Sequence, residues 1–127
     1  MEHLKHHVIT GKILGAAFEV HKFLGNGFQE KVYQRALAWE LTQAGLGFQC
    51  EIAQDIFYTD VPQPIGQRRV DFLVENKVII ELIARSAIES EHVCQTLNYL
   101  KVYQLEVALL INFGAKSMEF KRLVLRR

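Results

Sequence analysis

Apolar residues recur at helical spacing in two segments near the amino end of the chain. In residues 8–24 they form one stripe, made of Ile9, Ile13, Ala16, Ala17, Val20 and Phe23. In residues 28–44 the apolar side consists of Val32, Ala36, Leu37 and Leu41. This spacing predicts two helices. The sequence Gly25-Asn26-Gly27 between them tolerates positive φ and predicts a short turn, so the two helices should run antiparallel.

The spacing changes to that of strands after residue 47. The segments rich in aromatic, branched or alternating apolar residues are 48–58, 68–75, 78–84, 107–113 and 118–127. The run 107–113 is almost continuously apolar, as in a strand that is covered on both faces. Residues 60–66 contain both prolines of the chain and are expected to form a loop. Residues 88–103 return to helical spacing and predict a third helix.

The predicted elements follow the order α-α-β-β-β-α-β-β. This order indicates an α/β fold with a central mixed β-sheet flanked by helices. The chain has 127 residues, which fits a single domain over residues 1–127. The segment 118–127 is expected to form a final edge strand with a basic end.

Composition says more about where the protein is located than about the reaction it could catalyse. The chain has 15 Lys and Arg against 14 Asp and Glu, so only local clusters of charge can indicate a polyanion partner. Cys50 and Cys94 lack the spacing of a zinc site or a disulfide framework, which favours a reducing compartment. No apolar run reaches the ~20 residues of a membrane span, and residues 1–11 lack the apolar segment of a signal peptide. We therefore expect a cytoplasmic protein with no membrane partner.

Two acidic residues, Asp71 and Glu81, lie on neighbouring strands of a predicted hairpin. The short turn Asn76-Lys77 would place Asp71 opposite Leu82, with the two carboxylates on opposite faces of the sheet. A three-residue turn or a bulge would instead place Asp71 directly opposite Glu81. The residues alone leave both registers open. They also leave open whether the acids pair with nearby arginines or share a hard cation such as Mg²⁺ or Mn²⁺.

For several other polar residues, the sequence likewise leaves open whether they belong to a functional site or to an ordinary surface. Glu30 shares a predicted helical face with Tyr33 and Leu37, and Gln95 shares one with His92 and Tyr99. Either face could line a polar interior or belong to an ordinary surface. The basic residues that could contact phosphate, rather than merely be solvated, are Arg68, Arg69, Arg85, Lys116, Lys121, Arg122, Arg126 and Arg127.

Five short sequences occur in an order that resembles a known family. The first, VHKFLGNGFQEKVY at residues 20–33, contains the signature Gly-x-x-Glu-x-x-Tyr. It is followed by RRVDFLV, VIIEL, QTLNYL and LLINFG. Together they resemble the GxxExxY protein family, a branch of the PD-(D/E)XK nuclease-like superfamily, from about residue 8 to residue 124. The resemblance implies a restriction-endonuclease-like αβββαβ core with an extra N-terminal helix.

The resemblance also implies roles for individual residues. Asp71 corresponds to the metal-binding Asp of the superfamily, and Glu81 to the acid of its (D/E)-x-K motif. Glu30 corresponds to the helical Glu that supports the metal site, and Gln95 to a glutamine near the scissile phosphate. These roles imply a nuclease that depends on Mg²⁺ or Mn²⁺, with Asp71 and Glu81 as metal ligands and nucleic acid, in particular DNA, as its substrate.

Ile83 departs from this pattern, because it occupies the position of the motif lysine. Residues two apart on a strand share a face, so that lysine would point the same way as Glu81. It would orient the attacking water and stabilise charge on the phosphoryl oxygens, and isoleucine does neither. Arg85, ~6.6 Å further along at ~3.3 Å per residue, is the candidate replacement. It could clamp a phosphate but could not act as a base.

Activity is therefore expected to be reduced or lost, and two other function classes stay open. One is a nucleic-acid-binding module without catalysis, with Arg68, Arg69 and Lys116 among its phosphate contacts. The other is an interaction protein, in particular a homodimer whose final edge strands pair with each other.

Overall fold

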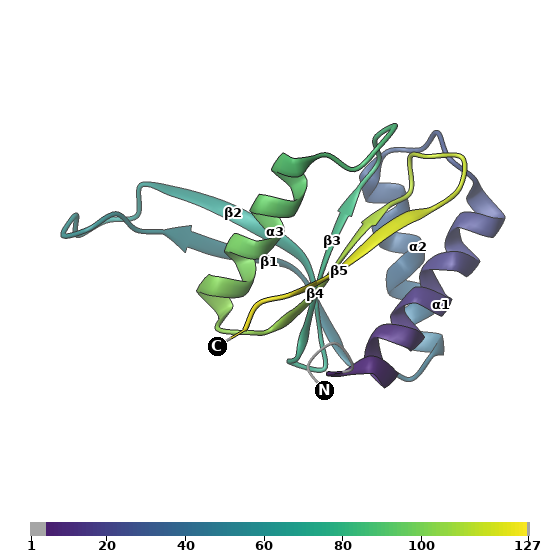
Figure 1. The fold of residues 1–127 in the computed structure, drawn as a ribbon, viewed down its shortest axis with the longest axis horizontal. Coiled ribbons are helices and arrows are strands. Elements are labelled where there is room, and N and C mark those ends of the chain that lie inside the picture. Colours follow the sequence, from purple (N-terminus) through teal and green to yellow (C-terminus); the bar gives the residue numbers. More distant parts are fainter. Residues whose placement is uncertain (1–4, 127) are drawn as a thin grey trace.

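The helices and strands follow the order predicted from the spacing of apolar residues. The computed structural model describes residues 5–126 (Figure 1). Its elements are α1 (His7–Leu24), α2 (Glu30–Gln43), β1 (Phe48–Ile56), β2 (Gly66–Val74), β3 (Val78–Ile83), α3 (Ser90–Tyr103), β4 (Val107–Asn112) and β5 (Glu119–Val124). In the part of the chain that the structure describes, no helix is both long and apolar enough to cross a membrane.

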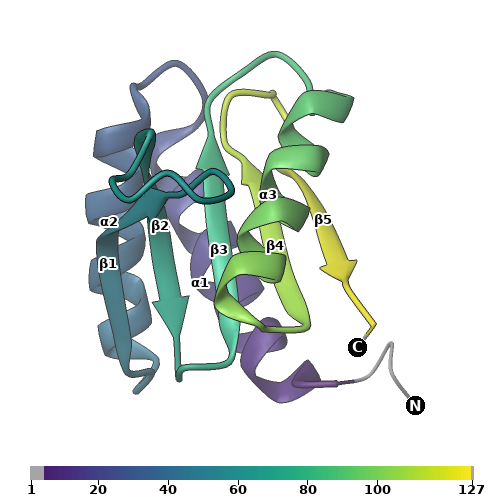
Figure 2. The ribbon, with the colours of Figure 1, turned by 90° about the vertical axis from the view of Figure 1, so that its left-hand side faces the viewer.

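The five strands form one mixed sheet in the order β1-β2-β3-β4-β5. Neighbouring strands are antiparallel except β3 and β4, which are parallel. A parallel pair needs a crossover connection, and α3 provides it. Figures 1 and 2 show α1 and α2 on one face of the sheet and α3 on the other. The segments α2-β1-β2-β3-α3-β4 form the expected αβββαβ core of a restriction-endonuclease-like fold, and α1 is the additional N-terminal helix.

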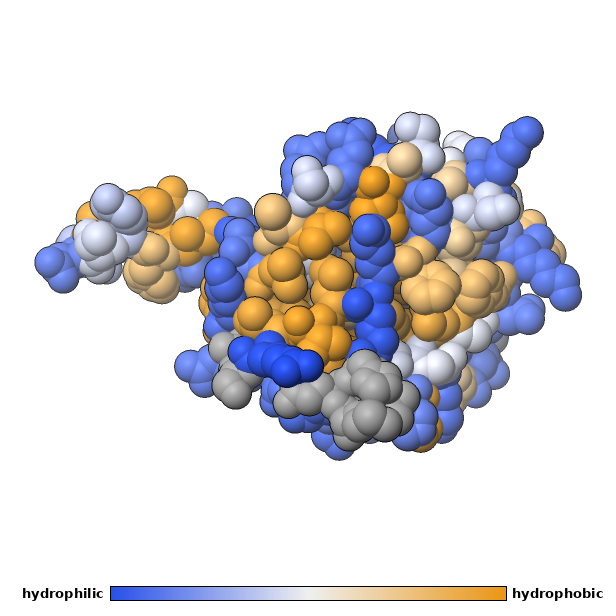
Figure 3. All heavy atoms as spheres, in the orientation of Figure 1, coloured by the Kyte–Doolittle hydropathy of each residue, from blue (hydrophilic) through white to orange (hydrophobic). Residues whose placement is uncertain are grey.

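Apolar packing on both faces of the sheet explains why β3 and β4 are buried along their whole length. The larger core lies under α1 and α2 and includes Ile13, Leu37 and Phe72. The smaller core lies under α3 and consists of Val70, Ile79, Tyr99, Leu100 and Ala108. Because one helix alone covers this second face, apolar side chains remain at the surface over α3 and β5 (Figure 3).

Two apolar residues of the predicted helical stripes are at the surface. Phe23 is 89% exposed and Val32 39%. At the end of α1, Leu24 packs against the core instead of Phe23, since both are within one helical turn of Val20. The prediction was therefore wrong for Phe23, because spacing alone does not decide between positions three and four residues along.

The glycine and tyrosine of the Gly-x-x-Glu-x-x-Tyr sequence hold the turn between α1 and α2. Gly27 has a φ of 111°, a conformation that residues with a side chain rarely adopt. The hydroxyl of buried Tyr33 donates to the carbonyl of Gly25 at 2.6 Å and accepts the N–H of Phe28 at 3.2 Å. Its ring stacks on Phe113 with a centroid separation of 4.7 Å. These contacts fix the direction in which α2 starts, and Glu30 is its first residue.

The hairpin of β1 and β2 extends beyond the other strands and projects from the body of the molecule (Figure 1). Strand β1 ends at Ile56, two residues earlier than predicted, and Ile56 pairs with Gly66. Residues 57–65, with both prolines, form the expected loop at the tip. The base of this hairpin lies beside α3 and contributes to the site described next.

Candidate functional site

The turn between β2 and β3 sets the register of the two central acids. Val74 pairs with Val78, so the turn has three residues, 75–77. Glu75 and Asn76 both have positive φ, 54° and 55°, which allows the chain to reverse in this way. The two-residue turn predicted at Asn76-Lys77 was therefore wrong. The three-residue alternative holds, and in this register Asp71 lies level with Glu81.

Strands β2 and β3 separate at the site, and the carboxylate of Asp71 fills the gap in the hydrogen bonds. Their pairing ends at Phe72 and Ile80. Beyond that point the N–H of Leu82 donates to Oδ2 of Asp71 at 2.8 Å. A buried N–H needs an acceptor, and the side chain supplies it where the strand no longer does. Asp71 therefore has a structural role in addition to any chemical one.

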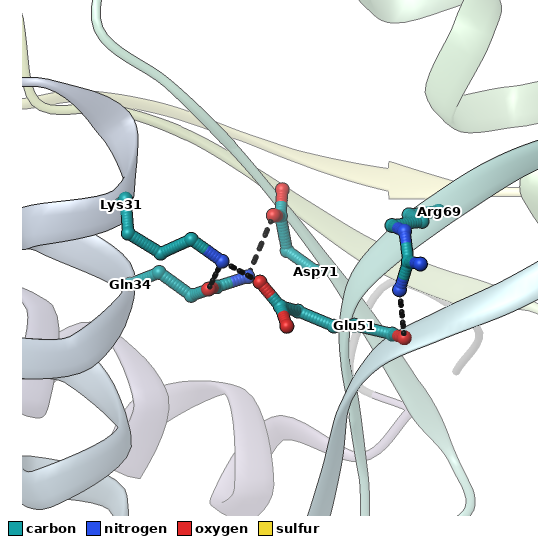
Figure 4. Close-up of polar contacts among 5 residues, drawn as sticks. All are labelled: Lys31, Gln34, Glu51, Arg69 and Asp71. Atoms are coloured by element: carbon teal, nitrogen blue, oxygen red, sulfur yellow. Dashed lines mark hydrogen bonds and ion pairs between the residues drawn. The ribbon is translucent and has the colours of Figure 1, made fainter.

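A chain of polar contacts from α2 and β1 holds the other oxygen of Asp71 (Figure 4). The amide of Gln34 donates to Oδ1 at 3.1 Å, and its own oxygen accepts from the ammonium of Lys31 at 3.3 Å. Lys31 also forms an ion pair with Glu51, which lies across from Asp71 on β1. Since Lys31 orients the Gln34 amide, its N–H₂ group is directed at Asp71. The sequence did not point to Gln34; the one available signal was its place a turn after Glu30.

Glu81 is a buried acid in a strand that is otherwise apolar. It is 8% exposed, and burial raises its pKa to about 10. A hydrogen bond with Asp71 and the negative charge of Asp71 also raise that pKa, whereas a hydrogen bond with Tyr99 lowers it. At neutral pH the Asp71–Glu81 pair therefore holds a proton, because two adjacent carboxylates cannot both ionise at low cost.

Glu30 approaches the same acids from the start of α2. Loss of hydration raises the pKa of its carboxyl, and so does the negative charge of Asp71. A backbone hydrogen bond from Ala84, the positive charge of Arg85, and His92 when it is protonated act in the opposite direction. The predicted shared face with Tyr33 and Leu37 holds only in part, because those residues enter the core while Glu30 stays exposed.

Helix α3 closes the site from the other face of the sheet. Tyr99 is buried, and burial together with the charge of Glu81 raises its pKa to about 12. Its hydroxyl donates to the carbonyl of Arg69 at 3.2 Å and accepts from the Gln95 amide at 3.1 Å. The guanidinium of Arg68 lies 5.0 Å from the centre of the Tyr99 ring, within cation–π range.

The three acids Glu30, Asp71 and Glu81 line one pocket of about 310 Å³ together with residues of α3. Its lining consists of Glu30, Arg68, Arg69, Asp71, Glu81, Leu82, Ile83, Arg85, His92, Gln95 and Tyr99. The structure thus brings together all the acids, Gln95 and three of the arginines that the sequence put forward. Of the other basic residues put forward, Lys116, Lys121, Arg122 and Arg126 do not line this pocket, and Arg127 lies outside the described residues. Lys116 is exposed in the bend after β4 and is not among the described residues that line this pocket.

Ile83 and Arg85 both line the pocket, but Ile83 belongs to a strand and Arg85 to the bend that follows it. Ile83 ends β3 and is 7% exposed, on the same face as Glu81. Arg85 lies beyond the strand, so its predicted place further along a straight strand was wrong. Its N–H donates to Oδ1 of buried Asn112 at 3.0 Å. A Cβ on Gly114 would lie 2.3 Å from that nitrogen, so this close approach requires glycine.

Two of the acids suit a hard divalent cation. Among residues 5–126, no group of three or more His, Cys, Asp or Glu side chains is arranged to hold a metal ion. Asp71 and Glu81 are in contact, however, and the two Asp71 oxygens have lone pairs left beyond their hydrogen bonds with Gln34, Leu82 and Glu81. Mg²⁺ is commonly bound through one or two carboxylates, with water and phosphate oxygens completing its shell. The donor set therefore fits Mg²⁺ or Mn²⁺.

Comparison with known proteins identifies the class. The family model described as the PD-(D/E)XK nuclease superfamily matches residues 7–123, and the chain belongs to that superfamily. A solved structure titled "Crystal structure of SSO0001" is similar in fold, with a TM-score of 0.60 and 17% sequence identity. The match covers 75% of this chain and 50% of that one, so the chain spans about half the length of that protein. No curated protein sequence matches.

Proposed function

We propose that the chain binds nucleic acid, in particular DNA, in the pocket around Asp71 and Glu81 and hydrolyses its phosphodiester bonds slowly, with Mg²⁺ or Mn²⁺. We also propose that it belongs to the GxxExxY branch of the superfamily. The observation that carries the proposal is the contact between Asp71 and Glu81 at the point where β2 and β3 separate. Glu30 and Gln95 line the same pocket and add to the argument.

Each residue of the pocket has a defined task in this proposal. Asp71 and Glu81 would hold the divalent cation, which when bound supplies Lewis-acid chemistry and positive charge. Gln95 would orient the phosphate through its amide, since Tyr99 already engages the same amide group and limits its rotation. Arg85 would bind phosphate oxygens as a fixed cation, because arginine stays protonated in proteins.

Ile83 favours a second candidate function, which is nucleic-acid binding without catalysis. An isoleucine cannot donate a hydrogen bond or carry charge at the position where the motif has lysine. Loss of one preorganised donor typically costs ~10²–10³-fold in rate. Metal binding depends on the carboxylate oxygens and does not need the lysine.

Cleavage of fluorescent single- and double-stranded DNA with Mg²⁺ or Mn²⁺ separates the two candidates. The set consists of the wild type, Asp71→Asn, Ile83→Lys and Ile83→Met. Asparagine keeps an acceptor for the N–H of Leu82, so that variant should fold. Methionine matches the length of lysine without its charge.

We expect slow cleavage by the wild type, none by Asp71→Asn, and a gain of ~10²-fold in Ile83→Lys alone. If the wild type binds DNA without cleaving it and Ile83→Lys gains cleavage activity, the second candidate function is established. Equal cleavage by the wild type and Asp71→Asn would exclude a role for this site in catalysis.

A further inference from the structure

His92 lies in the first turn of α3 and lines the pocket, although none of the tasks above uses it. Its Nδ1 accepts the N–H of Glu89 at 3.0 Å, and the carboxylate of Glu89 in turn accepts the backbone N–H of His92. This reciprocal pair is a capping box, which satisfies free donors at the start of a helix. The imidazole is therefore held in one orientation by the backbone of its own helix.

The capping contact also determines where the ring carries hydrogen. A neutral imidazole has one donor and one acceptor nitrogen, and Nδ1 is the acceptor. The hydrogen must then be on Nε2, so the ring offers an N–H group at its far end. Since the ring is half-buried and lines the pocket, a donor is available in the pocket that Asp71 and Glu81 also line.

Two other donors in the pocket, Arg68 and Arg69, already have partners within the protein. Arg69 donates through Nη1 to the carbonyl of Glu51 at 3.2 Å, and Arg68 lies over the ring of Tyr99. The position of the motif lysine holds Ile83, which donates nothing. His92 lines the pocket together with Glu30, and it lowers the pKa of that carboxyl when the imidazole is protonated, so the imidazole lies near the acidic side of the pocket.

We propose that the Nε2–H group of His92 donates a hydrogen bond to a non-bridging phosphate oxygen of nucleic acid bound in this pocket. This inference rests on the proposed binding of nucleic acid. It adds a donor from α3 to a pocket in which Ile83 supplies none at the position of the motif lysine. The Glu89 contact positions the imidazole in advance, so little freedom is lost when the phosphate binds.

Two substitutions separate the donor from the cap. In His92→Asn the amide oxygen takes the place of Nδ1 and can keep the Glu89 contact, but the far donor is lost. In His92→Gln a longer amide places an N–H near the position of Nε2. Glu89→Ala removes one half of the capping box and leaves the imidazole, and Asn98→Ala on the exposed side of α3 is a matched control.

The experiment measures binding of a fluorescein-labelled 12-nucleotide single-stranded DNA by anisotropy, with Mg²⁺ at low temperature and thermal melting of every variant. We expect His92→Asn to weaken binding about tenfold, as for one hydrogen bond to a charged oxygen. His92→Gln should bind within about threefold of the wild type. Glu89→Ala should melt earlier but bind nearly as well, and Asn98→Ala should match the wild type in both. The Nε2 resonance of His92 should shift when the DNA is added.

The outcomes distinguish the two proposals. If the wild type binds and His92→Asn binds equally well, the contact from His92 is excluded while the proposed function stands. If Glu89→Ala loses as much affinity as His92→Asn, the role of His92 is to cap the helix. If the wild type does not bind DNA at all, the proposed function fails and this inference fails with it.

Discussion

At the scale of single residues, the buried carboxyl of Glu81 opposes folding at neutral pH. The folded protein holds a proton on Glu81, with a pKa of about 10, that the unfolded chain releases near its ordinary value of 4.5. A carboxyl with a raised pKa favours the folded state at low pH. That contribution is lost as the pH rises from about 4.5 toward about 10. The strand keeps an acid where an apolar residue would be more stable, which is typical of functional sites.

Glu81→Gln should therefore stabilise the protein at neutral pH. Glutamine has nearly the same shape and cannot ionise, so the variant should gain up to about 3 kcal/mol near pH 7 in metal-free buffer. The gain should shrink to less than about 1 kcal/mol at pH 5, where the carboxyl ionises much less in the unfolded chain. Urea denaturation at both pH values measures the difference. Parallel pH profiles for the wild type and the variant would contradict this role of Glu81.

Gln34 acts through Asp71, and its removal should weaken the proposed metal site. Gln34→Ala deletes the donor to Oδ1 of Asp71 and leaves Lys31 without one of its acceptors. Loss of an outer partner of a ligand typically costs 10–100-fold in metal affinity, so Mn²⁺ binding should weaken by about tenfold or more. Calorimetric titration with Mn²⁺ measures this. Gln43→Ala, at the exposed end of the same helix, is the control, and equal affinities in the two variants would exclude the role.

At the scale of elements, the site depends on where segments start, stop and separate. Strand β2 pairs with β3 only from Phe72 onward, β3 ends at Ile83, and α2 starts at Glu30. The first of these leaves Asp71 just outside the β2–β3 pairing, and the other two place Ile83 and Glu30 at the ends of their elements. The start of α2 is explained by a single side chain, because the hydroxyl of buried Tyr33 forms hydrogen bonds with both Gly25 and Phe28 in the turn before it.

Tyr33→Phe should loosen that turn while leaving the core filled. The variant keeps the ring on Phe113 but leaves the Phe28 N–H and the Gly25 carbonyl without their partner. An unmet buried hydrogen bond costs about 1–3 kcal/mol, so the free energy of unfolding should fall by that amount. Denaturation in urea checks it, with exposed Tyr58→Phe as the control. A stability equal to that of the wild type would show that water replaces the hydroxyl.

At the scale of the whole molecule, the projecting hairpin is separate from the cores that hold the fold together. Phe57, Tyr58 and Ile65 at its tip are 62%, 61% and 58% exposed. Among the described residues, those of 57–65 belong to neither core cluster. The tip thus contributes little apolar burial to stability, in contrast to the base, where Val70 is buried under α3.

The tip can therefore be shortened at small cost. Replacing residues 57–65 by Asn-Gly would join Ile56 and Gly66, which already pair, by a two-residue hairpin turn. The free energy of unfolding should change by less than about 1 kcal/mol, because loop length has a weak effect on stability. Urea denaturation of the shortened and full chains measures this. A loss of several kcal/mol would mean that the tip packs on the body of the molecule.

Much of the fold follows from local patterns. Each helix and strand was predicted because its apolar residues repeat with the period of the element that buries them. The α/β class followed from the order of the elements. The family resemblance depended on short sequences that lie in the segments around the site, so Asp71, Glu81 and Ile83 could be singled out before any contact was known. Local spacing was insufficient at the ends of elements, as at Phe23 and at the turn 75–77.

The contacts of the site depended on packing between elements distant in the chain. The pairing of Asp71 with Gln34, the proton on Glu81 and the place of Arg85 beside Asn112 all join residues far apart in sequence. The repeat of apolar residues within one helix or strand does not determine the angle at which another element packs against it. Burial and the distance between charges, which set pKa values and ligand geometry, arise only when the chain has folded. The identity of each acid was thus readable from the sequence, and its environment was a product of the fold.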